Sequence, residues 1–339
     1  MYAGQGGTSS APYSTGTHNV AVGYEALKGF TTGQTNVAIG GYAGASVSSG
    51  QKNVAIGYTS LNYLTDGTDS VAVGYHAGYY GTGSYNTFVG SQAGKGGTTS
   101  APYSSGQYNV AMGTEALEGF TTANYNTAIG YQAGEAITSG IGNAFLGFRA
   151  GLGATTADYS VGIGYGALGD ATLTGNYNIG IGLNAGMDLT SGANNIILGY
   201  NAGDAMTDTS NTVLIGYLAG SSINHSDASS TVMIGAYAGD AITSGQFNIG
   251  LGKATLSTLT TGDDNIAIGN QALETHLTGL RNIAIGNNAM YNTDAGSTAQ
   301  DSDDNIFIGY TAGGGTWANT ESKENVAIGN YAMDAALDG

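Results

Sequence analysis

The side chains that most often perform catalysis or bind metals are few in this sequence, and they are scattered. The four histidines, His18, His76, His225 and His276, do not recur at the spacing of metal ligands, and there is no cysteine. A zinc site or a cysteine nucleophile therefore has little to be built from. We expect the histidines to lie in exposed loops. We predict that the protein is not an enzyme and uses no cofactor or metal.

Acidic residues cluster in two places. Asp301, Asp303 and Asp304 lie in one segment, and Asp263 and Asp264 in another. Clustered carboxylates can bind calcium, but the spacing of a known calcium loop is absent, so a solvated acidic loop is the alternative. Glycine pairs of the G-x-G type precede no predicted helix, which argues against a nucleotide-binding loop.

The composition excludes several classes of function. Only 7 of the 339 residues are Lys or Arg, and the formal net charge is −17, so neither nucleic acid nor an anionic membrane surface is a predicted partner. No apolar run approaches the roughly 18 residues of a membrane span, and the first residues lack the pattern of a secretory signal. Charged residues make up 9% of the chain and hydrophobic residues 41%, which is typical of extracellular fibres and adhesins rather than of disordered chains.

A short unit repeats along almost the whole sequence, most often at a spacing of 17 residues. Numbering each copy from its first residue as position 0, the unit reads N-Φ-small-Φ-G-x-x-A-[GL]-x-x-Φ-T-[ST]-G-x-x, where Φ is aliphatic or aromatic. Eighteen copies begin at Asn19, Asn36, Asn53, Ser70, Asn86, Asn109, Asn126, Asn143, Ser160, Asn178, Asn195, Thr212, Thr231, Asn248, Asn265, Asn282, Asn305 and Asn325. Such a strict period predicts rungs of one backbone conformation that stack on one another, that is, an all-β parallel solenoid.

Each rung has a physical interpretation. Positions +1 to +3 predict a short strand, with +1 and +3 on one face and +2 on the other. Position +4 is Gly in every copy and is expected to turn the corner. Ala at +7 and Gly or Leu at +8 indicate a second short strand, and Thr-Ser-Gly or Thr-Thr-Gly the turn back. Asn at position 0 suits a ladder of stacked side-chain amides.

Position +2 is never charged or polar. It is Ala or Gly in twelve copies, and in the others it is Phe88, Phe145, Ile197, Leu214, Met233 or Phe307. A strand that is apolar on both faces is buried on both, so we predict that +1 and +3 fill the core and +2 packs against other copies of the chain. The alternative places +2 against the same chain's second strand, with +1 and +3 outward. It is disfavoured because such a row of Val and Ile would aggregate if open to solvent.

Tyrosine recurs at position +5, immediately after the invariant glycine. The residues are Tyr24, Tyr58, Tyr75, Tyr131, Tyr165, Tyr200, Tyr217 and Tyr310. We expect their rings to pack as a ladder at a corner, and binding of sugars or of a cell surface through the ring faces is the alternative. A rung of 17 residues is itself too small to enclose a ligand.

The chain is predicted to be one repetitive domain, 1–339, with eighteen rungs from residue 19 and a partial rung before them. Longer loops are expected near residues 91–108, 287–304 and 310–324, where the spacing exceeds 17. At about 4.8 Å per rung the rungs would form a rod on the order of 85 Å long. Neither end shows a polar cap, which suggests flanking parts or end-to-end stacking into a filament.

Segments such as Asn126-Thr127-Ala128-Ile129-Gly130-Tyr131-Gln132-Ala133-Gly134 carry a likeness to known repeats. They resemble the repeats upstream of the endosialidase-type intramolecular chaperone domain in phage tail fibres. They are also similar to the head repeats of trimeric autotransporter adhesins, whose period is shorter. The likeness covers nearly the whole chain and implies a homotrimer of left-handed parallel β-rolls with small residues at the trimer axis.

The sequence therefore predicts a structural and adhesive fibre segment, a rigid rod of a phage tail fibre that takes part in host-surface attachment. The alternative is a subunit of a bacterial extracellular filament or adhesin. The expected partners are further copies of the chain and a cell-surface glycan or protein, and the expected location is extracellular. An ice-binding protein and a depolymerase are less favoured, since neither flat files of Thr nor paired carboxylates recur.

Overall fold

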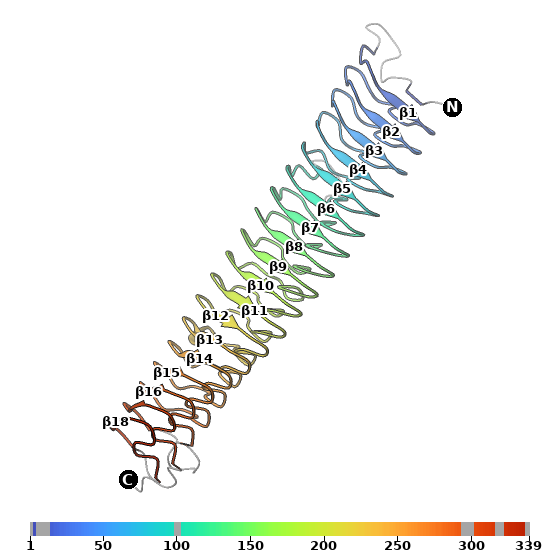
Figure 1. Cartoon of the computed structure of the whole chain (residues 1–339). Helices are drawn as coiled ribbons and strands as arrows, with labels where there is room; N and C mark the ends of the chain where they lie inside the picture. Colours follow the sequence, from blue (N-terminus) through green and yellow to red (C-terminus); the bar gives the residue numbers. More distant parts are fainter. Residues whose placement is uncertain (1–2, 5–13, 98–102, 293–301, 316–321, 336–339) are drawn as a thin grey trace. The chain divides into compact units, whose positions relative to one another are not determined.

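The computed structural model describes residues 3–4, 14–97, 103–292, 302–315 and 322–335. It consists of two units, residues 1–174 and 175–339, and each is a parallel β-solenoid in which one short strand per rung stacks on the next (Figure 1). The predicted all-β solenoid with rungs of about 17 residues is confirmed. The left-handed coil, the trimer and the single repetitive domain stay predictions.

Nine strands stack in the first unit, and each has three residues. They are β1 (Val20–Val22), β2 (Val37–Ile39), β3 (Val54–Ile56), β4 (Val71–Val73), β5 (Thr87–Val89), β6 (Val110–Met112), β7 (Thr127–Ile129), β8 (Ala144–Leu146) and β9 (Val161–Ile163).

Nine further strands stack in the second unit, together with a single turn of 3₁₀ helix. They are β10 (Ile179–Ile181), β11 (Ile196–Leu198), β12 (Val213–Ile215), η1 (Ser226–Ala228), β13 (Val232–Ile234), β14 (Ile249–Leu251), β15 (Ile266–Ile268), β16 (Ile283–Ile285), β17 (Ile306–Ile308) and β18 (Val326–Ile328).

The register of the strands follows the repeat. Position +1 pairs with +1 and +3 with +3, as in the pairing of Val20 with Val37 and of Val22 with Ile39. The same register holds across a 23-residue interval, where Ile283 pairs with Ile306. The longer intervals therefore do not shift the register of the strands. Much of these predicted loops, namely residues 98–102, 293–301 and 316–321, lies outside the described residues.

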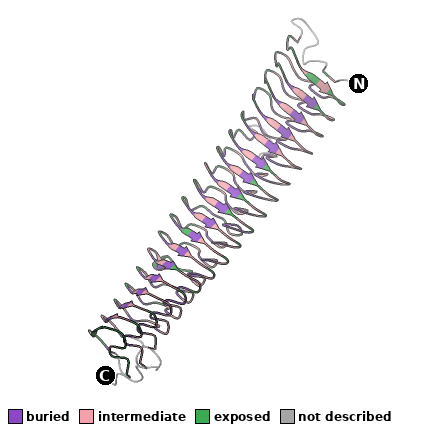
Figure 2. Ribbon diagram, viewed as in Figure 1, coloured by how far each residue is buried: buried purple, intermediate pink, exposed green. Residues whose placement is uncertain are grey.

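The strand faces have the opposite roles from those predicted. Position +2 is the buried one, because Ala38, Phe145 and Leu214 are fully enclosed while the residues on either side of them are partly or largely exposed. Figure 2 shows this as a buried middle residue in most strands. The prediction that +2 packs against other copies of the chain is therefore wrong. Position +2 points into the interior of its own solenoid, and +1 and +3 point outward.

Position +2 packs against position +8 of the same coil. A Cβ added to Gly151, at +8, would lie 2.5 Å from the Phe145 ring, at +2 of its own rung, and one added to Gly313 would lie 2.5 Å from the Phe307 ring. In every rung with a bulky +2 residue, +8 is Gly, and wherever +8 is Leu or Met, +2 is Ala or Gly. The two positions thus share one core volume, as dense packing requires.

The expected second strand is also absent from the described rungs. The residues after +4 form turns, with Ala at +7 fully buried, and each described rung has one named strand. The turns still bond between rungs. Leu27 N–H donates to the Ala43 carbonyl at 3.0 Å, and Tyr42 N–H donates to the Tyr24 carbonyl at 2.7 Å. Solenoid pairing therefore continues where no strand geometry exists.

The turns depend on left-handed residues at fixed positions. Every non-glycine residue with positive φ in the described chain lies at −1, +6 or +8, for example Tyr125 (φ 59°), Gln132 (φ 54°) and Leu117 (φ 51°). Such a conformation costs a non-glycine residue about 1–2 kcal/mol. At these positions the N–H donates to a neighbouring rung in most of the described rungs, as Tyr125 does to the Gln107 carbonyl at 3.1 Å, and such bonds offset that cost.

Glycine at +4 is required for two reasons, as predicted for the corner. Its φ lies near 135°, for example 134° at Gly40, a region that other residues rarely adopt. A Cβ on Gly40 would also lie 2.5 Å from the carbonyl oxygen of Gly57, the same position in the next rung. The rungs therefore touch backbone to backbone at this corner.

The predicted asparagine ladder is confirmed, and it is buried. Asn126 donates through Nδ2 to the Gly140 carbonyl at 2.8 Å and to Asn109 Oδ1 at 3.2 Å. Its Oδ1 accepts from the backbone N–H of Asn143 at 2.9 Å and from Asn143 Nδ2 at 3.0 Å. All polar atoms of a fully buried amide are thereby satisfied, which removes the cost of burying it.

We predict that Gly40→Ala destabilises the first unit by roughly 2–4 kcal/mol, because it adds an unfavourable φ and a backbone overlap. Gly41→Ala is the matched control. Gly41 has no positive φ, and its added Cβ would meet only the Tyr58 side chain at 3.3 Å, so we expect a change within about 0.5 kcal/mol. Urea unfolding followed by circular dichroism measures both. Equal losses would contradict the contact at the corner.

We predict that Asn126→Ala costs roughly 2–4 kcal/mol, since it leaves the buried Gly140 carbonyl and the Asn143 N–H without the partner that the Asn126 amide supplies. Asn126→Ser is expected to cost about half as much. Serine occupies this position naturally at Ser70, whose Oγ accepts from the Asn86 N–H at 3.3 Å. The same unfolding measurement applies, and a serine variant as unstable as the alanine variant would show that the ladder bonds are not what the position needs.

Candidate interaction surfaces

The outward face of the strands is an aliphatic surface in each unit. Positions +1 and +3 carry Val, Ile, Leu or Met in nearly every rung, and Thr87 and Thr127 are the only polar residues there. Several of these side chains are well exposed, including Ile39 at 39% and Met112 at 44%. We call the +1 and +3 side chains of a unit its outward strand face. It bears no charge.

The outward strand face is comparable in area to the largest apolar patches of typical monomeric proteins. Nine rungs about 4.8 Å apart, with strands about 10 Å long, give each unit a footprint on the order of 400 Å². Contiguous apolar patches of a few hundred Å² on soluble proteins commonly mark interaction sites. Files of Val and Ile that are open to solvent favour aggregation. Because the structure places these files on the outside, the outward strand face is a candidate for contact with a partner.

The tyrosines at +5 are exposed and stack between rungs, in agreement with the predicted ladder. Tyr58 and Tyr75 have ring centroids 6.0 Å apart at 10°, and the rings of Tyr200 and Tyr217 are 5.1 Å apart at 10°. Rings stacked in this way cover one another's faces. They leave mainly edges and hydroxyls for solvent, which weakens the alternative of sugar binding within the files.

A second aromatic file, at position −1, was missed by the sequence analysis. Tyr85, Tyr108 and Tyr125 stack with centroids 4.8 and 5.0 Å apart and planes within 4°. The signal was present, since each of these tyrosines directly precedes the Asn of its rung. The file was not predicted because position −1 precedes the first residue of the repeat unit as numbered.

Aromatic residues also gather in the first unit beside the described end of a long loop. Tyr103 lies 4.5 Å from Tyr63 between ring centroids, and Tyr79 lies 4.7 Å from His76 in a stacked arrangement. Burial and a hydrogen bond with Tyr63 raise the pKa of Tyr79 to about 12. Burial, followed by the nearby Lys95 charge, lowers the pKa of His76. Through these ring contacts Tyr103, at the described end of the loop, packs against the stacked rungs.

The histidines do not form a site. His18 is exposed, and His225 lies at the start of η1, where its Nδ1 accepts from the Asp227 N–H at 3.2 Å. His276 contradicts the expectation of an exposed loop residue, because it is fully buried, with Nε2 3.0 Å from Asn282 Nδ2. It replaces the apolar residue at +11 and makes a polar contact with the asparagine ladder instead.

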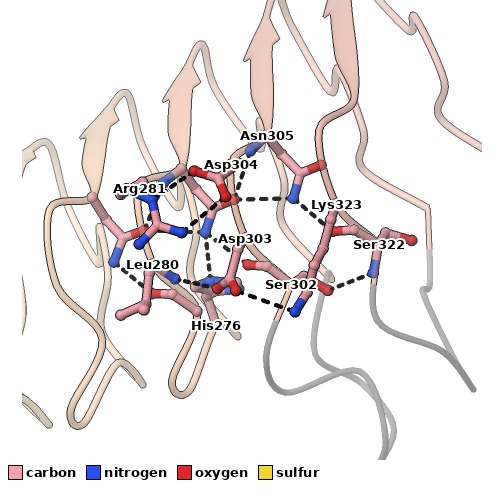
Figure 3. A network of polar contacts seen from close by, with 12 residues as sticks. His276, Leu280, Arg281, Ser302, Asp303, Asp304, Asn305, Ser322 and Lys323 are labelled. Atoms are coloured by element: carbon pink, nitrogen blue, oxygen red, sulfur yellow. Dashed lines mark hydrogen bonds and ion pairs between the residues drawn. The ribbon is translucent and has the colours of Figure 1, made fainter.

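The described acidic residues of the 287–304 interval are engaged in ion pairs (Figure 3). Arg281 binds Asp304 through two bonds of 2.6 and 2.9 Å, and its guanidinium holds the pKa of Asp304 below the ordinary value. Asp303 accepts from the Leu280 N–H at 2.8 Å and lies 3.4 Å from Lys323. Asp301 lies outside the described residues. Within the part that the structure describes, no group of three potential ligands could hold a metal ion.

The Thr hydroxyls at +12 have a structural role. Thr121 Oγ1 donates to the Thr138 carbonyl at 2.8 Å, and Thr138 Oγ1 donates to the Thr155 carbonyl at 3.1 Å. Hydroxyls that bond between rungs are less able to order water at a surface. This weakens the ice-binding alternative further.

A polar network crosses three rungs at positions +6 and +9 of the first unit. Lys95 pairs with Glu118 at 2.7 Å, and Gln132 donates to Glu115 at 3.0 Å. Glu135 lies beside these carboxylates, and burial, then the charges of Glu118 and Glu115, raises its pKa. The network is a surface lattice of long side chains with an excess of negative charge.

Comparison with known proteins does not assign the chain to a family, since no protein-family model matches it and the curated proteins yield no match. Among the described residues, no helix is long and apolar enough to cross a membrane. The β-solenoid fold fits a rigid structural fibre, and the outward strand face is the largest candidate interaction surface.

We predict that Glu135→Gln raises the melting temperature at pH 7. A carboxyl whose pKa is raised by folding contributes stability below its unfolded pKa and loses it as pH rises through the folded value. Neutral Gln removes that loss, so we expect a gain of roughly 1–2 °C at pH 7 that vanishes near pH 4. Glu25→Gln is the control, because Glu25 pairs with Lys28 at 3.1 Å and should give no gain. An equal gain from both variants at both pH values would refute the assignment.

Proposed function

We propose that this chain is a segment of a structural and adhesive fibre, in which copies associate side by side through the outward strand face as a homotrimer. The single observation behind the proposal is the uncharged aliphatic surface formed by +1 and +3 in each unit. A chain with a formal net charge of −17 repels its copies everywhere else, so an uncharged face is where they can approach.

The regularity of this face supports another copy of the chain as the partner. Its side chains recur at the rung spacing, and the repeat keeps one register through the long intervals. Only a surface with the same period can match such files over their whole length. Interdigitated Val and Ile would bury apolar area at roughly 25 cal/mol per Å², which favours stable association.

The fibre we propose belongs to a phage tail and supports attachment to the host surface, outside the cell. The resemblance of the rung to tail-fibre repeats supports this, and so does a surface poor in charge. A bacterial extracellular filament or adhesin is the competing assignment. Electron microscopy separates them, since a tail fibre is found on virions, and a bacterial filament is open-ended and unattached to particles.

Sedimentation equilibrium of the purified chain tests the association. We expect a mass three times that of one chain. The triple variant Ile129→Thr, Leu146→Thr, Ile163→Thr should shift the protein toward monomer by at least tenfold in dissociation constant, because it places three hydroxyls in the apolar face. Threonine already occupies an outward strand position in two rungs, so the fold should tolerate it.

The matched control is Thr122→Ala, Ser139→Ala, Thr156→Ala, which changes three exposed turn residues of the same region. It should sediment like the unmodified chain. A monomeric unmodified chain, or equal weakening by both triple variants, would overturn the proposed association.

A further inference from the structure

A hollow interrupts the turn surface of the second unit. It has a volume of about 420 Å³ and lies at positions +5, +6, +9 and +10 of the rungs of β13, β14 and β15. Its cause is visible in the sequence. The rung of β14 has Ala254 at +6 and Ser257 at +9, whereas the rung of β15 has the long side chains Gln271 and Glu274 there.

The two walls of the hollow are therefore separated by one rung of small side chains. Tyr237 and Asp240 come from the rung of β13, and Gln271 and Glu274 from the rung of β15. Rungs two steps apart are about 9.6 Å apart. The volume falls within the roughly 300–1,000 Å³ of small-molecule sites.

The lining of the hollow includes both hydrogen-bond acceptors and donors. Asp240 has a buried Oδ1 without a hydrogen-bond partner, and burial raises the pKa of this carboxyl. Glu274 accepts from Gln271 Nε2 at 2.7 Å through only one oxygen, Oε2. Lys253 makes no ion pair within the described residues. A buried acceptor without a partner is costly, so a ligand donor that drew the Asp240 carboxylate toward the hollow would recover free energy.

Tyr237 adds an aromatic wall. Its ring contacts Tyr217 edge to face, with centroids 5.2 Å apart at 69°, as Tyr42 contacts Tyr24 and Tyr331 contacts Tyr310. An aromatic face attracts the weakly positive C–H groups of a ligand. The hollow is thus lined by the ring of Tyr237, two carboxylates, one ammonium and one amide, and the small side chains of Ala254 and Ser257 lie at its base.

Other ligand classes fit less well. A phosphate would meet two carboxylates, and a metal ion would meet Lys253 with too few ligands. The equivalent hollow of the first unit, about 370 Å³ beside Lys95, Glu118 and Glu135, differs because Lys95 and Glu118 already pair with each other at 2.7 Å. In the second unit's hollow the lysine, Lys253, makes no ion pair within the described residues.

We propose that this hollow binds a neutral hexopyranose unit of a surface glycan, with Tyr237 against the sugar's C–H face and Asp240 and Glu274 accepting from its hydroxyls. Lys253 and Gln271 donate to its ring and hydroxyl oxygens. The assignment rests on the proposed adhesive function and names the ligand class that the fibre would hold. A single sugar in an open site of this size binds in the millimolar range.

Saturation-transfer NMR on the full chain tests the site, using methyl glycosides of glucose, galactose, mannose and N-acetylglucosamine, with methyl glucosaminide as a cationic comparison. We expect transfer to at least one neutral glycoside. The double variant Ala254→Gln, Ser257→Glu fills the hollow with the residues that the neighbouring rung already carries, and it should reduce binding at least tenfold without disturbing the fold. Tyr237→Ala and Asp240→Asn should each weaken binding.

Asp204→Asn is the matched control, because Asp204 occupies the same +9 position in the rung of β11, outside the hollow. It should bind like the unmodified chain. No transfer to any neutral glycoside, transfer to the cationic glycoside alone, or equal binding by the filled variant would overturn the site. Sedimentation of the same samples keeps the outcomes separate, since a chain that associates but binds no sugar refutes only this site.

Discussion

Backbone hydrogen bonding between successive rungs is the interaction on which the rest of the structure depends. It includes the strands, and it continues through the turns at −1, +6 and +8. A left-handed residue costs about 1–2 kcal/mol, close to the net value of one hydrogen bond. In most of the described rungs the left-handed positions supply such a bond to the adjacent rung. The conformation is therefore stable only in a stack, and every rung must repeat it.

This constraint explains which positions vary. Gly at +4 cannot change, because the backbones of adjacent rungs meet there, as Gly40 and Gly57 do. Asn at 0 is nearly fixed, because its amide bonds both to the turn of its own rung and to the neighbouring rungs. The interior tolerates variation only in compensating pairs, such as Phe145 at +2 with Gly151 at +8. The exposed side chains at +1 and +3, by contrast, vary among Val, Ile, Leu, Met, Thr and Ala.

Much of the fold could be predicted from the sequence, because a strict period means that equivalent residues of successive rungs have the same backbone conformation. The strand at +1 to +3, the corner glycine and the asparagine ladder were predicted and found, whereas the second strand expected around +7 and +8 was not found. The direction of the strand faces was predicted wrongly, since alternation separates +2 from +1 and +3 but does not say which side is inside. The size pairing of +2 with +8, as in Leu214 with Gly220, would have answered that question.

The left-handed turn residues could not be predicted, for a physical reason. Tyr125 and Gln132 have no intrinsic preference for that conformation, and only the adjacent rungs impose it. The hollow over β14 was likewise hidden. No sequence motif marks it. It arises because two small residues in one rung lie between larger residues in the rungs on either side, which is apparent only once the stacking order of the rungs is known.

The same constraint explains how such a fold acquires function. Since the backbone is fixed by its neighbours, a change at an exposed position alters surface chemistry without altering the rung. Ala254 and Ser257 replace side chains of the size of Gln271 and Glu274 while β14 keeps its register with β15. A binding site can therefore be opened in one rung, while the files of Val and Ile in all the others remain available for association. The proposed sugar site and the proposed association face occupy different positions of one repeat, so a substitution at one leaves the side chains of the other unchanged.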